Sequence, residues 1–281
     1  MRQFILQSQI PKDNLIVLKS KDFRYLRQVL RSKTGDTLNV RTKEGILCNA
    51  TVLKIDDKLH TVTLKICNEN SAATNCEINN QNNTSDTEFW LFQFLPRPQK
   101  FEQIVRQATE CGINEIIPVL GEYSEKSSAS VLENQKKERI EKIIKEARQQ
   151  SGSPVQTKVV SAVNLEDACK LWQKNLQNLD ENQKSIALVL SEHNDCETSL
   201  FKIIETVENH KANEKSEVKS QNKGKSIKKI ALAIGSEGGI SLQEIQTLKK
   251  CGFIPIHFNV NILRCETAAL YGIAAVQSMI L

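Results

Sequence analysis

The chain has 281 residues, of which 40% are hydrophobic and 25% charged, a composition typical of an ordinary folded protein. It has no run of 18 apolar residues and no signal-peptide core near its N-terminus, so we expect neither a membrane partner nor secretion. Its eight scattered cysteines include no C-x-x-C pair, which argues against a zinc ribbon or a disulfide framework. The composition therefore predicts a cytoplasmic protein with reduced thiols and no metal site.

Basic charge is concentrated in residues 1–67, which hold 13 Lys and Arg against 6 Asp and Glu, whereas the rest of the chain holds 25 against 27. A basic segment of this kind is expected where a protein contacts a polyanion. The same segment alternates apolar and polar residues as β-strands do, in the runs Thr37 to Val40, Ile46 to Ile55 and Thr61 to Ile66. We therefore predict a small β-rich domain over residues 1–67.

A helix is predicted between these strands, from Asp22 to Ser32. Its arginines, Arg24, Arg27 and Arg31, recur at spacings of three and four residues and would form a basic stripe on one face. A solvated helix face is the ordinary explanation of such a stripe. Because few acidic residues accompany these arginines, we favour contact with an RNA backbone.

Two polar segments interrupt the pattern. Residues 68–87 contain seven Asn among Ser, Thr and Asp, and we interpret them as a linker. Residues 208–228 are rich in Lys, Asn, Ser and Glu, and we expect them to form a mobile insertion. Both are expected to loop out at the surface without changing the core.

After the linker, apolar runs alternate with helical patterns up to Leu281. The runs are nearly continuous, as buried parallel strands require, and cover Phe89 to Leu95, Glu115 to Leu120, Ser185 to Leu190, Lys229 to Ile234 and Phe253 to Phe258. Helices are predicted at 98–111, 134–150, 165–175, 199–207, 242–251 and 266–280. This order predicts an α/β domain with a mainly parallel sheet over residues 88–281.

Three glycines stand where one of these strands turns into a helix, in the segment Ile234-Gly-Ser-Glu-Gly-Gly-Ile-Ser241. Glycine lets the backbone approach a ligand closely, so the segment suits a binding loop. The spacing matches neither a phosphate loop nor the dinucleotide-binding pattern. A plain turn remains an alternative, because Ser241 and Glu244 form a capping box that alone could explain the sequence.

A second candidate segment is Asn261-Ile-Leu-Arg-Cys-Glu-Thr-Ala-Ala-Leu270. It places Arg264 and Glu266 just before an apolar helix, although an Arg-x-Glu pair could equally be a surface ion pair. Together with the glycine segment and Arg97-Pro-Gln-Lys-Phe-Glu-Gln-Ile-Val-Arg-Gln-Ala-Thr-Glu-Cys-Gly-Ile-Asn-Glu-Ile-Ile-Pro118, it resembles the RsmE family. Members of this family are SPOUT-superfamily enzymes that use S-adenosylmethionine to methylate the N3 nitrogen of a uridine in small-subunit (16S) ribosomal RNA.

The resemblance implies a trefoil-knotted SPOUT domain preceded by a PUA-like β-barrel that binds RNA. It also implies a homodimer acting on ribosomal RNA or the assembled small subunit. Cofactor contacts are expected from the glycine segment and the residues before Arg264, namely Gly235, Glu237, Gly238, Gly239, Asn259, Val260, Ile262 and Leu263.

The catalytic residues are expected to be Arg264 and Glu266. The fork of Arg264 suits an oxygen acceptor of the uracil ring, and Glu266 is expected to orient that arginine. Thr267 is expected to cap the last helix, and His193 is a weaker candidate for a proton shuttle. Arg148 and Gln150 lie in a stretch similar to one near the family's active site and are expected to reach RNA.

Four residues depart from the family's usual sequence: Ser236 replaces Pro, Asn259 and Val260 replace Leu and Gly, and Cys265 replaces Thr. A valine in place of glycine would fit poorly if that position needs a positive φ angle. Two other functions stay open. One is a related knotted ribose 2′-O-methyltransferase, and the other is an RNA-binding ribosome-assembly factor without catalytic activity.

Overall fold

The chain divides into two compact units, one formed by residues 1–83 and 145–156 and the other by residues 84–144 and 157–281. The computed structural model describes residues 3–42, 45–67, 87–124, 135–180, 183–192, 199–209 and 227–280. None of the helices in these ranges is both long and apolar enough to cross a membrane.

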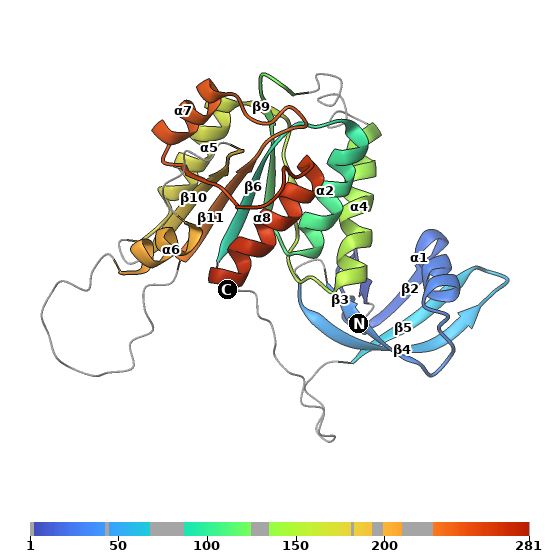
Figure 1. Ribbon diagram of the computed structural model, residues 1–281. Helices are drawn as coiled ribbons and strands as arrows, with labels where there is room; N and C mark the ends of the chain where they lie inside the picture. The colour runs from blue at the N-terminus through green and yellow to red at the C-terminus, as the bar shows by residue number, and fades with distance from the viewer. Residues whose placement is uncertain are drawn as a thin grey trace, which may run out of the picture. The chain divides into compact units, whose positions relative to one another are not determined.

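The first unit is built on a curved five-stranded sheet with the order β1-β3-β4-β5-β2 (Figure 1). Alternate side chains of the strands, such as Val52, Val62 and Leu64, are buried in one apolar core, to which Phe4 and Leu26 also belong. The strands span Phe4–Ile5 (β1), Leu15–Lys19 (β2), Thr37–Arg41 (β3), Leu47–Asp56 (β4) and Thr61–Cys67 (β5).

The helix of this unit differs from the predicted one. It begins at Ser20 as an α-helix (α1, Ser20–Arg24) and continues as a π-helix (η1, Tyr25–Val29). The N–H of Leu30 donates to the carbonyl oxygen of Tyr25 at 3.0 Å, which is the wider i→i−5 pattern. A wider turn changes which residues share a face, so the arginine spacing no longer defines one straight stripe.

The second unit contains a parallel sheet with the order β12-β10-β11-β6-β7-β8, and β9 also pairs with β7. Every recorded pairing in it is parallel, as in Leu91↔Leu232 between β6 and β11. Its strands span Glu88–Phe94 (β6), Glu115–Leu120 (β7), Lys158–Val159 (β8), Val163–Asn164 (β9), Lys184–Leu190 (β10), Ile227–Ile234 (β11) and Ile254–Ile256 (β12). The predicted α/β fold with a parallel sheet is confirmed.

Helices cover both faces of this sheet (Figure 1). Four of them pack on one face: α2 (Pro98–Glu110), α4 (Gln135–Ser151), α6 (Leu200–Asn209) and α8 (Cys265–Ile280). On the other face lie α5 (Leu165–Leu176) and α7 (Leu242–Lys250).

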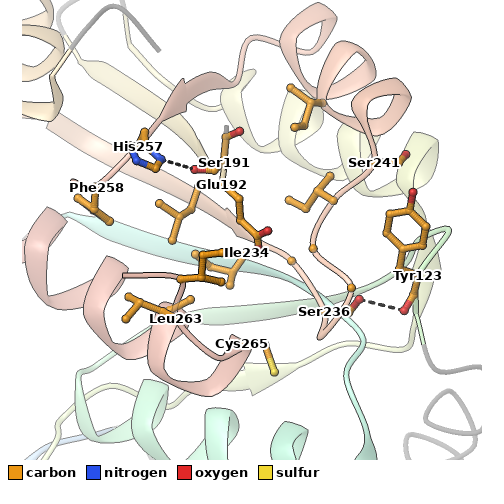
Figure 2. A pocket seen from close by; sticks show the side chains of 18 of the residues that line it. Tyr123, Ser191, Glu192, Ile234, Ser236, Ser241, His257, Phe258, Leu263 and Cys265 are labelled. Carbon is orange, nitrogen blue, oxygen red and sulfur yellow. Dashed lines mark hydrogen bonds between the residues drawn. The ribbon is translucent and has the colours of Figure 1, made fainter. Parts of the chain in front are cut away.

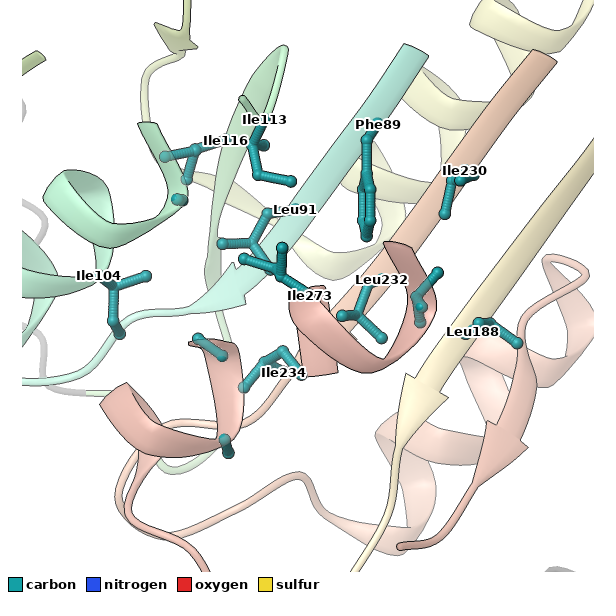
Figure 3. Close-up of a cluster of buried hydrophobic side chains, with 14 of the residues drawn as sticks. Phe89, Leu91, Ile104, Ile113, Ile116, Leu188, Ile230, Leu232, Ile234 and Ile273 are labelled. Atoms are coloured by element: carbon teal, nitrogen blue, oxygen red, sulfur yellow. The ribbon is translucent and has the colours of Figure 1, made fainter. Parts of the chain in front are cut away.

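Side chains alternate between the two faces along each strand, so β6 supplies two cores. Phe89 and Leu91 point into the core beneath α2 and α8, where Leu232 and Ile273 join them (Figure 3). Phe92 points the other way, onto Trp172 of α5 and Phe253. Burial on both faces is the reason that these strands read as continuous apolar runs.

Several predicted segments fall outside the described residues. The predicted linker does so except for Thr87, and so does most of the predicted insertion, whose two ends belong to α6 and β11. The division into two units assigns residues 145–156, which follow the middle of α4, to the first unit. The domain boundaries at 67 and 88 remain a prediction.

Candidate functional site

A cavity of about 430 Å³ opens at the carboxyl edge of the parallel sheet, a volume in the range of small-molecule sites. Its walls come from the ends of strands β7, β10, β11 and β12 and from the starts of α7 and α8 (Figure 2). Ligands of parallel α/β sheets bind at this edge, because the carboxyl ends of the strands and the loops after them meet there. The lining includes Tyr123 after β7, Leu190 to Glu192 at the end of β10, Ile234 to Ser236 and Gly238 to Leu242 at and after the end of β11, Ile245 of α7, His257, Phe258 and Val260 to Leu263 after β12, and Cys265 and Ala268 of α8.

The glycine segment forms a tight loop in which the N–H of Gly239 donates to the carbonyl oxygen of Ser236 at 3.1 Å. Gly239 has a φ angle of +77°, and a Cβ at Gly235 would lie 2.7 Å from the carbonyl carbon of Gly239. Both positions therefore need glycine for the loop itself to close. Beneath the loop, the buried side chain of Gln93 donates to the carbonyl oxygen of Gly235 at 3.0 Å.

The loop after β7 holds the glycine segment from the other side. Ser236 Oγ donates to the carbonyl oxygen of Tyr123 at 2.9 Å, and a Cβ at Gly238 would lie 2.7 Å from the Cβ of Tyr123. Glu244 accepts from the N–H of Glu122 at 2.7 Å and from the N–H of Ser241 at 2.9 Å. The predicted capping box is confirmed, and its glutamate also anchors this second loop.

The segment before α8 forms the opposite wall of the cavity. The N–H of Val260 donates to the carbonyl oxygen of Phe258 at 2.7 Å, and Val260 does not have a positive φ angle. The position therefore does not need glycine, which removes the concern raised by that departure from the family's sequence. Val260 and Ile262 expose 44% and 84% of their surface, so the wall presents apolar side chains to a ligand.

Two polar residues in the lining follow strands β10 and β12. The Nδ1–H of His257 donates to the carbonyl oxygen of Ser191 at 3.0 Å (Figure 2). The other ring nitrogen, Nε2, is then left to form a further hydrogen bond. Across the cavity, Glu192 lies so close to the glycine loop that a Cβ at Gly239 would be 3.5 Å from its Oε1.

The predicted catalytic pair does not form. Arg264 is exposed, and Glu266 instead binds the ammonium group of Lys100, whose Nζ lies 3.2 Å from its Oε2. Burial alone would raise the pKa of Glu266, but hydrogen bonds from its own N–H, from Cys265 and from Lys100 hold that pKa below its ordinary value. Among the described residues, the cation that pairs with Glu266 is therefore Lys100, and the catalytic roles expected of Arg264 and Glu266 stay predictions.

One further expectation for this segment also changes. Thr267 is not the helix cap, because α8 begins at Cys265 and Thr267 lies in its first turn. Cys265 is a thiol rather than a thiolate, since burial, a hydrogen bond to Glu266 and nearby acidic groups raise its pKa to about 12. Its side chain lines the cavity as a neutral group.

The remaining predicted cofactor residues divide into two groups. Gly235, Gly238, Gly239, Val260, Ile262 and Leu263 line the cavity, whereas Glu237 and Asn259 do not. The carboxylate of Glu237 accepts from the N–H of Arg97 at 3.2 Å. His193, the candidate proton shuttle, lies outside the described residues.

The predicted RNA-binding residues belong to the first unit. Arg24 is exposed, but Arg27 donates to both carboxylate oxygens of Asp57 at 3.1 and 3.0 Å. Arg31 is exposed just beyond the π-helix, with a φ angle of +55°. The basic stripe is thus reduced to two available arginines.

Arg148 and Gln150 differ in exposure. Arg148 is 5% exposed and donates to the carbonyl oxygen of Pro154 at 3.2 Å, and burial, reinforced by the charge of Arg41, lowers its pKa. A buried guanidinium has no surface to offer RNA, so the expectation for Arg148 fails in this structure. Gln150 is exposed and remains a candidate for contact with RNA.

The sequence reasoning missed Tyr123, Glu192 and His257, which all line the cavity. Each follows the carboxyl end of a strand, by three, two and one residues respectively. These residues could have been predicted, because positions just after the strands of a parallel sheet meet at one edge of it.

The fold and the cavity define a class of protein: a parallel α/β domain with a ligand site at its carboxyl edge, attached to a small β-rich unit. The chain belongs to the RNA methyltransferase family. The sequence profile of the RNA methyltransferase domain matches residues 83–277, and the profile of the PUA domain of RNA methyltransferases matches residues 18–65.

Relatives with assigned names agree with this family. The chain is 27% identical to ribosomal RNA small subunit methyltransferase E 2 of Borreliella burgdorferi, over 100% of this chain and 98% of that protein. It is 25% identical to ribosomal RNA small subunit methyltransferase E of Buchnera aphidicola, over 98% and 92%.

Solved structures share the fold over nearly the whole chain. One is ribosomal RNA small subunit methyltransferase E of Neisseria gonorrhoeae bound to S-adenosylmethionine, with a TM-score of 0.69, 20% identity and coverage of 99% and 98%. Another is a methyltransferase of Legionella pneumophila in complex with the same cofactor, with a TM-score of 0.68, 20% identity and coverage of 98% and 96%.

Proposed function

We propose that this protein transfers the methyl group of S-adenosylmethionine to the N3 nitrogen of a uridine in small-subunit ribosomal RNA. The observation that carries the proposal is the shared cavity: segments predicted separately as a cofactor loop and a substrate loop line one site in a member of the RNA methyltransferase family. The names of the relatives and the cofactor in two similar structures support the same activity.

The lining fits S-adenosylmethionine. The exposed side chains of Val260 and Ile262 suit the flat apolar faces of an adenine ring. Among the described residues, the backbone N–H groups of Asn261, Ile262 and Leu263 have no hydrogen-bond partner, which leaves donors for the polar edge of such a ring. We assign Glu192 to the ribose, because a carboxylate accepts hydrogen bonds from hydroxyl groups.

The glycine loop contributes shape and backbone groups rather than charge. Gly235, Gly238 and Gly239 line the cavity without a side chain, so a ligand can approach the main chain closely. We assign Glu237, which faces away from the cavity lining toward Arg97, to support of the loop.

Bound S-adenosylmethionine supplies a methyl group already activated by the positive charge on sulfur. The protein's task is then to align uridine N3 with that group and to stabilise the negative charge left on the uracil ring when N3 loses its proton. We assign this charge stabilisation to Arg264, because it is an exposed residue between Leu263 and Cys265, which both line the cavity, and its guanidinium is permanently charged.

The first unit is proposed to hold the RNA backbone. Its match to a PUA domain and its exposed Arg24, Arg31 and Gln150 support this role. Phosphate contacts of this kind fix the position of the RNA without reading its sequence.

We also propose that the protein acts as a homodimer in the cytoplasm and that its second unit is knotted, as the resemblance implies. The exposed apolar side chain of Tyr271, whose ring lies against that of the cavity residue Phe258, supports a second copy covering this region. Light scattering of the purified protein tests this part, and a mass equal to one chain would refute the dimer.

The decisive experiment incubates the protein with small-subunit RNA, with or without ribosomal proteins, and S-adenosylmethionine. The RNA is then digested to nucleosides and analysed by mass spectrometry. We expect N3-methyluridine. A ribose-methylated nucleoside would instead show a 2′-O-methyltransferase, and absence of cofactor binding at millimolar concentration would show an inert RNA-binding protein.

A further inference from the structure

We propose that Lys100 is a positioning residue for the cavity: its ammonium group joins the glycine loop to the first turn of α8 and fixes these two walls relative to each other. The inference rests on the proposed function for its effect on cofactor binding. Its structural part can be tested without cofactor. Lys100 does not line the cavity, so it would act through the residues it holds.

The contacts come from three elements that are distant in the sequence. Lys100 stands in the first turn of α2, and its Nζ lies 3.2 Å from Glu266 Oε2 in α8 and 3.9 Å from Glu237 Oε1 in the glycine loop. The N–H of Arg97, at the start of α2, donates to the same Oε1 of Glu237 at 3.2 Å. One end of α2 therefore binds both walls.

Each carboxylate is adjacent in the chain to residues that line the cavity. Glu237 lies between Ser236 and Gly238, and Glu266 follows Cys265. The Sγ of Cys265 also donates to Glu266 Oε2 at 3.3 Å. A shift of either carboxylate would therefore move the cavity wall directly.

Burial makes this cluster stronger than an ordinary surface pair. The side chains of Lys100, Glu237 and Glu266 are 29%, 32% and 13% exposed. Without the ammonium group, two carboxylates that now lie within 4 Å of one nitrogen would repel each other in a poorly solvated place. They would also oppose the approach of RNA phosphates.

The chain offers a matched control in Lys170. Its Nζ lies 2.8 Å from Asp167 Oδ1, a shorter distance than either Lys100 contact, but both residues belong to α5 and are 74% and 49% exposed. An exposed pair within one helix contributes little and joins no separate elements. If the N···O distance alone determined how much an ion pair contributes, replacing Lys170 would have a larger effect than replacing Lys100.

The first measurement is hydrogen exchange of the cofactor-free protein. We expect Lys100→Met to exchange faster than wild type in both the glycine loop, 235–239, and the first turn of α8, 265–268, whereas Lys170→Met exchanges as wild type does. Unchanged exchange in both segments of Lys100→Met would overturn the proposal. If Lys100→Met does not fold, Lys100→Gln, which keeps a donor but not the charge, takes its place with the same two outcomes.

The second measurement is cofactor affinity by calorimetry. We expect Lys100→Met to weaken S-adenosylmethionine binding about tenfold or more, Lys100→Arg to recover most of the loss, and Lys170→Met to stay within about twofold. The double variant Lys100→Met/Glu266→Gln should bind better than Lys100→Met, because the uncompensated charge is gone. Equal affinities of Lys100→Met and wild type would overturn the positioning role.

The two measurements separate this inference from the proposed function. If wild type binds no S-adenosylmethionine, the proposed function fails, while the exchange experiment still decides whether Lys100 joins the two walls.

Discussion

Ser236 donates a hydrogen bond from its Oγ to the carbonyl oxygen of Tyr123, at 2.9 Å, across 113 positions of the sequence. Both residues line the cavity, one after β11 and the other after β7. Ser236 is only 5% exposed, so this hydroxyl links two walls from inside. A proline, the family's usual residue at this position, could not make the link.

The first prediction concerns this bond. Ser236→Ala should lower the free energy of unfolding by about 1 kcal/mol, the usual contribution of a hydrogen bond of this kind. Ser278→Ala is the matched control, because Ser278 Oγ also donates over 2.9 Å to a carbonyl oxygen, that of Ala275, but at an exposed place within α8. Urea denaturation of both variants gives the comparison. Equal losses of unfolding free energy in the two variants would mean that the hydrogen bond between Ser236 and Tyr123 contributes no more than an exposed one.

The second prediction concerns Gly238. A Cβ there would meet Tyr123 Cβ at 2.7 Å rather than the space of a ligand, so Gly238→Ala or Gly238→Val should displace the loop and weaken S-adenosylmethionine binding more than about tenfold. The double variant Gly238→Ala/Tyr123→Gly removes the collision and should bind better than Gly238→Ala alone.

Gly252→Ala serves as the control for Gly238. Gly252 has a φ angle of +88° and open space around its missing side chain, so alanine there brings backbone strain but no collision. We expect a loss of stability of about 1 kcal/mol with unchanged cofactor affinity. Equal effects of both variants on binding would refute the assignment of Gly238 to the site.

The third prediction is a dependence on pH. The pKa of Glu266 is lowered in the folded protein, so its ionised form stabilises the fold above the pKa of the unfolded chain. That contribution is lost as the pH falls through the lowered folded-state pKa. The stability difference between wild type and Glu266→Gln should therefore be constant near neutral pH and shrink below about pH 4.5, the ordinary value. A difference that grows on acidification would contradict this sign.

The fourth prediction separates substrate from cofactor. Arg264→Lys keeps the charge but loses the planar fork, so kcat should fall much more than cofactor affinity. Arg106→Lys, which changes an exposed arginine of α2 outside the cavity lining, should leave both unchanged. Parallel losses of turnover and cofactor affinity in Arg264→Lys would place this residue on the cofactor side.

Much of the fold follows from the sequence, because a parallel strand buried on both faces has to be apolar throughout. The run predicted at Glu115 to Leu120 coincides with β7, and Lys229 to Ile234 lies within β11. The two-residue strands β1, β8 and β9, the strand β2 and the π-helix escaped prediction. Two residues cannot show alternation, and a π-turn depends on the surrounding packing. The strand β2 does alternate and could have been predicted.

The site was less predictable than the fold. The sequence indicated two of the segments that form the cavity, the glycine segment and the segment before α8, but not Tyr123, Glu192 or His257. It could not indicate which cation binds Glu266, because Arg264 is near in sequence whereas Lys100 is near in space. Which side chains of different helices and strands form ion pairs depends on the tertiary structure, and local sequence patterns do not reveal it.

The last prediction tests the RNA-facing role of the first unit through Arg24 and Arg31. Replacing an exposed arginine that contacts phosphate should lower the slope of log affinity against log salt by roughly 0.7 to 0.9, for every RNA sequence alike. Arg31→Gly should in addition raise stability by roughly 0.5 to 1 kcal/mol, because glycine relieves the φ angle of +55°. Arg27→Ala should change stability rather than the slope, since its guanidinium is held by Asp57. RNA affinity of Arg24→Ala/Arg31→Gly at several salt concentrations, with cofactor calorimetry alongside, gives the answer: a wild-type slope would reduce these arginines to an ordinary solvated surface.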